Sequence, residues 1–137
     1  MQNSRFAVAV HIFTLLAWGR GEPMTSAFIA GSVNTNPVVV RRLLAELREA
    51  GLVSSKSGPG GGWVLERDPS LVRLDQILAV VQPGLPFGLH ATPPNPACPV
   101  GRQIQGRLEQ CFDAARKAQD AELAKTTIAD LLAELQD

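Results

Sequence analysis

The segment from Thr35 to Arg42 combines side chains that can recognise bases with side chains that can hold phosphates. Asparagine can pair with adenine, arginine with guanine, and valine can contact the methyl group of thymine. The residues expected to contact DNA here are Thr35, Asn36, Val38, Val39, Arg41 and Arg42. The alternative for the two arginines is an ordinary solvated helix face. We expect them to contact DNA because of the pattern that surrounds them.

A second set of residues with this chemistry surrounds a glycine-rich turn. Glycine lets the main chain come close to sugar and phosphate, and lysine adds a positive charge. We expect contacts to the DNA backbone or minor groove from Lys56, Ser57, Gly58, Gly60 and Gly61. Thr25 and Ser26, at the start of another predicted helix, are expected to hold phosphates with their helix N-terminal N–H groups. The alternative for the glycines is a tight hairpin without a DNA contact.

Cys98 is the candidate for a sensor, because Cys98-Pro99 marks the start of a helix. A helix N-terminus stabilises a thiolate, so this thiol could respond to oxidant or nitric oxide; the alternative is an inert thiol. Cys111 lies on an apolar stripe and is predicted to be a core residue. On one helix the two cysteines would be about 20 Å apart, too far for a disulfide within the chain. A disulfide between subunits remains open.

Composition and motifs argue against several other classes of protein. One alternative is an enzyme that uses Cys98 with a histidine base. The sequence has no Gly-x-Ser-x-Gly motif, phosphate loop or metal-ligand spacing that would support it. We therefore predict that the protein is not an enzyme. The apolar run from Phe6 to Trp18 is too short to span a bilayer and lacks a cleavage site. We therefore expect a cytoplasmic protein that does not bind membranes.

Charge is distributed unevenly although the net charge is zero. Residues 1–67 contain seven Lys or Arg and four Asp or Glu, whereas residues 68–137 contain six and nine. The basic half is the better candidate for contact with phosphates. With 45% hydrophobic residues, the chain can bury a core.

The basic half is predicted to form a winged helix-turn-helix, centred on residues 25–66. Apolar residues cover nearly all sides of a helix from about Asn3 to Trp18, capped by Asn3 or Ser4, so the core and a partner subunit are expected to share it.

A two-turn helix follows, with Phe28, Ile29 and Ala30 facing inward, then a turn over residues 31–34. Asn36-Pro37 begins a helix that Gly51 ends. Its apolar stripe is Val40, Leu43, Leu44 and Leu47. A hairpin over residues 52–65 forms the wing.

The second half is predicted to be helical around one long loop. Leu74, Ile77, Leu78 and Val81 indicate a helix, and five prolines in residues 83–97 indicate a loop. A long helix after Cys98 and a last helix through Leu135 follow. The fold class is thus mainly α with a small β-hairpin wing. We expect a DNA-binding domain over residues 1–82, a loop over 83–97 and dimerisation helices over 98–137.

The chain resembles the Rrf-type family of bacterial winged-helix regulators, which includes an iron–sulfur-cluster regulator, a nitric-oxide-sensitive repressor and a cysteine-metabolism regulator. The resemblance rests on the segments 33–44, 47–53 and 58–62, with weaker support from 98–101 and 127–131. It implies a homodimer that binds double-stranded DNA at a partly palindromic operator. It also implies that the long helix after the loop supplies much of the dimer contact. A repressor is the function expected.

The resemblance also shows where this chain departs from the family. Cluster-binding members have three closely spaced cysteines in the loop, and this chain has only Cys98 there. This excludes a cluster held by three cysteines, and we expect no iron–sulfur cluster and no other cofactor. Cluster ligation that involves histidine or carboxylate is the alternative that stays open. Ser57 stands where cluster-binding members often carry an arginine, which weakens the case for insertion into the minor groove. The remaining alternative is a winged-helix module that binds protein instead of DNA, for which the neutral net charge is the best argument.

Overall fold

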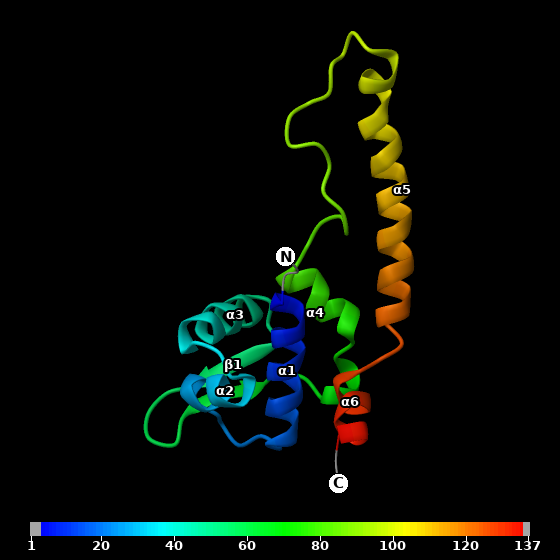
Figure 1. Ribbon diagram of the computed structural model, residues 1–137. Coiled ribbons are helices and arrows are strands. Elements are labelled where there is room, and N and C mark those ends of the chain that lie inside the picture. Colours follow the sequence, from blue (N-terminus) through cyan, green and yellow to red (C-terminus); the bar gives the residue numbers. More distant parts are fainter. Residues whose placement is uncertain (1–3, 136–137) are drawn as a thin grey trace.

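The structure is a computed structural model that describes residues 4–135 (Figure 1). The elements in chain order are α1 (Arg5–Trp18), α2 (Ser26–Val33), α3 (Pro37–Glu49), β1 (Val53–Lys56), β2 (Gly62–Leu65), the 3₁₀ turn η1 (Pro69–Leu71), α4 (Leu74–Val81), α5 (Pro99–Leu123) and α6 (Ile128–Leu135). The predicted fold class, mainly α with a hairpin, is confirmed. Asn3, one of the two predicted caps of the first helix, lies outside the described residues. Ser4 occupies the cap position of α1 but makes no side-chain cap hydrogen bond.

The helix-turn-helix begins and ends at the residues that helix chemistry favours. Thr25 caps α2, and its hydroxyl oxygen accepts a hydrogen bond from the N–H of Phe28. Asn36 caps α3 in the same way for Val38, with Pro37 at the first helical position. Gly51, at a φ of +77°, follows α3 as predicted.

The turn between the two helices is shorter than predicted. Residues 31–33 continue α2, so the predicted turn over 31–34 is wrong in that part. Asn34 alone takes the left-handed conformation, at a φ of +64°, and its N–H donates to the carbonyl oxygen of Ala30. A short polar side chain tolerates this conformation, so one asparagine is enough to end the helix.

The wing is an antiparallel hairpin that is joined to the segment before α2. Its register runs from Val53 opposite Leu65 to Lys56 opposite Gly62. Trp63 also exchanges two backbone hydrogen bonds with Met24, at 2.7 and 3.1 Å. The hairpin is therefore fixed to the start of the helix-turn-helix by main-chain hydrogen bonds.

The core lies around α1, which contacts α2, α4, α6 and β2. The predicted apolar stripe of α3 is confirmed, since Val40, Leu43, Leu44 and Leu47 are all fully buried. Ile128 of α6 belongs to the same core. We grouped α6 with the dimerisation helices, but it packs on α1 and η1. The long helix and the last helix therefore do not form one separate unit.

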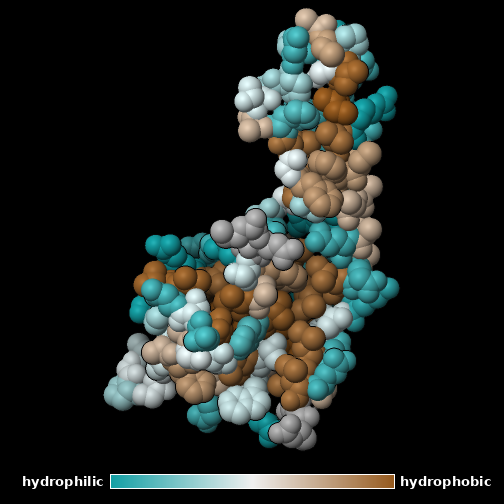
Figure 2. Space-filling model, viewed as in Figure 1, coloured by the Kyte–Doolittle hydropathy of each residue, from teal (hydrophilic) through white to brown (hydrophobic). Residues whose placement is uncertain are grey.

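The loop and α5 extend away from this body as an arm (Figures 1 and 2). The described segment 83–97 contains neither helix nor strand, as predicted. It packs on α5 through Phe87 and Phe112, whose rings meet edge to face at 5.3 Å. Along α5, all of which is described, no residue is buried. Cys111 is exposed, so its prediction as a core residue is wrong for the single chain: its side of α5 has nothing packed against it.

Candidate nucleic-acid interface

The N-terminal end of α3 presents two valines and two arginines to solvent. Val38 and Val39 are 46% and 42% exposed, and Arg41 and Arg42 are exposed as well. The apolar stripe that anchors the helix starts at Val40 and lies on another face. The four exposed side chains are therefore not needed to attach α3 to the core, and they are free to meet a partner.

The charged side chains of α3 divide into two groups. Glu46 forms an ion pair with Arg5 of α1, whose guanidinium also donates to the carbonyl oxygen of Val81. Arg48 lies over the ring of Trp63, at 5.3 Å from the centroid. Within residues 4–135, Arg41 and Arg42 form no ion pair. The C-terminal part of α3 is thus held by contacts within the protein. Within residues 4–135, the two arginines near its N-terminus have no acidic partner, so an external anionic group can pair with them.

Two of the polar residues predicted near the helix starts, Thr25 and Asn36, cap their helices. The Asn36 side-chain oxygen accepts from the Val38 N–H at 2.8 Å, and the Thr25 oxygen accepts from the Phe28 N–H at 3.1 Å. Ser26 and Thr35 are half-buried. Phe28, which we predicted to face inward, is 52% exposed, so that prediction is wrong. The inward face of α2 is filled by Ile29 and Ala30 instead.

The glycine-rich turn is exposed at its tip and crowded at its base. Lys56, Ser57, Gly58 and Gly60 are exposed. A Cβ at Gly61 would lie 2.1 Å from the carbonyl oxygen of Lys56. At Gly62, a Cβ would lie 2.5 Å from the carbonyl oxygen of Met24. The turn itself therefore requires Gly61 and Gly62, whereas Gly58 and Gly60 have open space around them and need glycine only for their positive φ.

The two parts of this surface lie on the same side of the molecule. In Figure 1, α2, α3 and the hairpin tip lie on the side of α1 that faces away from α6. The contact between Arg48 and Trp63 joins the helix to the wing. Trp63 and Arg48 were not among the predicted site residues. An aromatic residue directly after the wing glycines was the signal that could have indicated this link.

Cys98 occupies the N-cap position of α5, as predicted, and its side chain is exposed. The backbone N–H groups of Gly101 and Val100 lower the pKa of the Cys98 thiol, because they favour the thiolate. The turn around it is tight: the Cys98 N–H donates to the carbonyl oxygen of Asn95, and a Cβ at Gly101 would lie 2.5 Å from that same oxygen.

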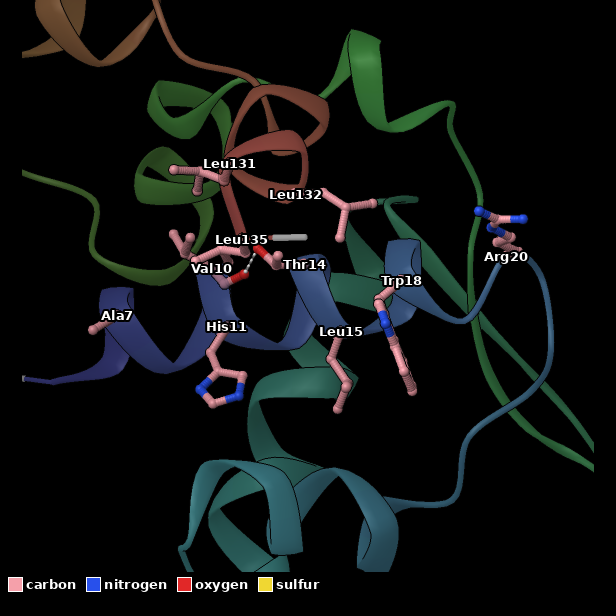
Figure 3. A pocket seen from close by; sticks show the side chains of 10 residues that line it. All are labelled: Ala7, Val10, His11, Thr14, Leu15, Trp18, Arg20, Leu131, Leu132 and Leu135. Atoms are coloured by element: carbon pink, nitrogen blue, oxygen red, sulfur yellow. Dashed lines mark hydrogen bonds between the residues drawn. The ribbon is translucent and has the colours of Figure 1, made fainter. Parts of the chain in front are cut away.

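A groove of about 790 Å³ runs along α1 and α6 (Figure 3). Most of the side chains that line it are apolar: Ala7, Val10, Leu15, Trp18, Leu131, Leu132 and Leu135, with His11, Thr14 and Arg20 as the polar members. His11 makes a 2.9 Å contact with the Ser32 hydroxyl of α2. The core therefore leaves one side of α1 uncovered.

A helix-turn-helix followed by a two-stranded wing, with basic side chains at the start of its second helix, defines a winged helix-turn-helix DNA-binding regulator. The family model for Rrf2, described as an iron-dependent transcriptional regulator, matches residues 2–134. The chain belongs to the Rrf2 family.

Individual relatives agree with this assignment. The chain is 41% identical over 133 residues to YwnA of Bacillus subtilis (strain 168), named as a candidate HTH-type transcriptional regulator, with 96% of this chain and 97% of YwnA covered. A solved structure of a candidate DNA-binding protein matches with a TM-score of 0.75 at 37% identity, over 94% of this chain and 99% of that one. CymR, the global cysteine regulator of B. subtilis, matches with a TM-score of 0.71 at 26% identity, over 99% and 98%.

The iron dependence in the family description does not fit the donor atoms of this chain. The whole sequence has two cysteines, so one chain cannot supply three thiolates to a cluster. Among the described residues, no group of three His, Cys, Asp or Glu side chains lies close enough to hold a metal ion. Separately, no helix in the described part of the chain is long and apolar enough to cross a membrane.

Proposed function

We propose that the protein is a repressor that binds a palindromic operator as a homodimer. The observation that supports this most is the exposed N-terminal end of α3, where Arg41 and Arg42 stand beside Val38 and Val39. A recognition helix enters the major groove by this end, while the wing follows the backbone with Lys56. A regulator of this kind acts in the cytoplasm by occupying the promoter.

Two uncovered apolar surfaces support the homodimer. One is the groove along α1 and α6, which includes the exposed Trp18 and Leu135. The other is the exposed side of α5 on which Cys111 and Ala115 lie one turn apart. A 25-residue helix without a single buried residue gains little stability from packing within its own chain. A second copy would cover both surfaces, and its two-fold symmetry would match a palindromic operator.

Within this proposal, Cys98 is the sensor and no cofactor is needed. Its thiolate attacks the O–O bond of hydrogen peroxide. One oxygen is transferred to the sulfur, which is oxidised by two electrons to the sulfenic acid, and the other leaves as hydroxide. Oxidation removes the negative charge that the backbone N–H groups of Gly101 and Val100 stabilise at the start of α5, and the dimer then releases its operator.

A gel-shift assay with the duplex upstream of the protein's own gene, and with a random duplex pool, tests DNA binding. We expect a retarded complex with two chains per duplex. No complex with either probe would contradict the proposal and favour the protein-binding alternative. Peroxide should release the DNA from the wild type but not from Cys98→Ser, with Cys111→Ser as the matched control. If peroxide released the DNA equally from Cys98→Ser and Cys111→Ser, Cys98 would not be the sensor.

A further inference from the structure

The exposed valines at the start of α3 have a more specific role than general contact. We infer that Val38 and Val39 recognise thymine methyl groups in the operator and so make thymine a requirement at one or two positions of each half-site. This inference rests on the proposed DNA-binding function and extends it to the sequence that is bound.

The fold gives no reason for valine at these two positions. The core face of α3 is complete without them, since Val40, Leu43, Leu44 and Leu47 are fully buried. Val38 and Val39 have about half of their surface in water. Valine has a lower helix propensity than lysine, glutamate or alanine, so an exposed pair of valines stabilises the helix less than polar alternatives would.

The polar residue nearest to this end is already engaged. The side-chain oxygen of Asn36 caps α3 by accepting from the N–H of Val38. Bidentate recognition of adenine would need that same oxygen to accept from the base, together with the Asn36 amide as a donor. Beyond the capping Asn36, the first exposed side chains that a base edge would meet are the two valines, followed one turn later by Arg41 and Arg42.

The chemistry of the major groove then selects the partner of the valines. The C5 methyl of thymine is the apolar group that base pairs present there, and valine can bury it by direct contact. The charged neighbours also favour DNA over an apolar protein surface. A protein patch that covered Val38 would also have to desolvate the exposed Arg42, which lies one turn further along the same face.

Replacing thymine by deoxyuridine removes only this methyl group, and so provides the test. A duplex would be selected from a random pool with the full-length wild type, and each thymine would then be replaced singly. We expect one or two positions per half-site at which wild-type binding weakens about fourfold, the loss that corresponds to one buried methyl group. Val38→Ala and Val39→Ala should each lose discrimination between thymine and deoxyuridine at a position where the wild type shows it.

The ratio of the two affinities is measured within each variant, so a general loss of affinity does not affect the result. Leu71→Ala, which shortens another exposed apolar side chain, should discriminate like the wild type. Equal binding of thymine and deoxyuridine duplexes by the wild type would overturn the inference and leave DNA binding intact. Unchanged discrimination in both valine variants would also overturn it. If no duplex were selected at all, the proposed function would fail with it.

Discussion

The guanidinium of Arg48 lies over the ring of Trp63, at 5.3 Å from its centroid. Arg48 is in the last turn of α3, and Trp63 is the second residue of β2. Because Trp63 is also paired through its backbone with Met24, this contact connects α3, the wing and the segment before α2. The relative position of α3 and the wing is therefore set by the protein itself.

Arg48→Ala should loosen this connection without unfolding the protein. We expect the free energy of unfolding to fall by about 0.5–1 kcal/mol, the contribution of an exposed cation–π contact. DNA affinity should fall as well, because the wing no longer has a fixed position relative to α3. Urea denaturation and fluorescence anisotropy measure the two effects. Arg67→Ala, an exposed arginine just after the hairpin, is the control, and equal losses of affinity in both variants would contradict the positioning role.

Alanine substitutions at the wing glycines should fall into two classes, which differ in how much they lower the free energy of unfolding. Gly61→Ala places a Cβ on the carbonyl oxygen of Lys56, so we expect at least about 2 kcal/mol of destabilisation in urea. Gly58→Ala has open space and faces only the penalty of its φ of +87°, about 1–2 kcal/mol. Equal destabilisation by the two substitutions would show that the crowding at Gly61 does not determine this turn.

Most of the DNA-binding half could be predicted from the sequence, because its signals are local. Asn36-Pro37 and Gly51 determine where α3 begins and ends, and the period of its leucines determines its buried face. The prediction for Phe28 was wrong because α2 is only eight residues long. Three consecutive apolar residues in so short a helix do not show which of them faces the core.

The second half was harder to predict because its packing depends on distant contacts. The leucines of α6 indicate a helix but not that α6 returns to α1, where Ile128 enters the core. Cys111 lies on an apolar stripe, and sequence periodicity does not distinguish a stripe that meets the chain's own core from one that meets another chain. The contact between Arg48 and Trp63 likewise depends on how the hairpin folds back on α3.

The Cys98 thiol should react at lower pH than an ordinary thiol. Because backbone N–H groups lower its pKa, the reactive thiolate is present at pH values where an unperturbed cysteine, with a pKa of about 8.5, is still protonated. The rate of iodoacetamide alkylation of Cys111→Ser, which retains Cys98, would be followed against pH. Its midpoint should lie below that of free glutathione. A midpoint at or above that of glutathione would contradict the assigned effect of the helix terminus.

The dimer should depend on the apolar stripe of α5. Ala115 is exposed in the single chain, so Ala115→Glu should leave each chain folded while placing a charge in the proposed interface. We expect analytical ultracentrifugation to show monomers for this variant and dimers for the wild type. Gln110→Glu adds a carboxylate on the opposite, polar side of α5 and should remain dimeric. If both variants remained dimeric, the dimer interface would not include this stripe, and the prediction would be wrong.

The measurement that tests the central claim most directly is a salt titration of duplex binding by the wild type and by Arg41→Ala/Arg42→Ala. A duplex selected with the wild type would be the probe, and Lys117→Ala, which alters a basic side chain of α5 paired with Asp113, would be the control. Wild-type affinity should fall steeply with salt, and the double variant should bind at least about tenfold more weakly, with an unchanged unfolding midpoint. Equal affinity of the wild type and the double variant would contradict the claim that α3 is the DNA-recognition helix.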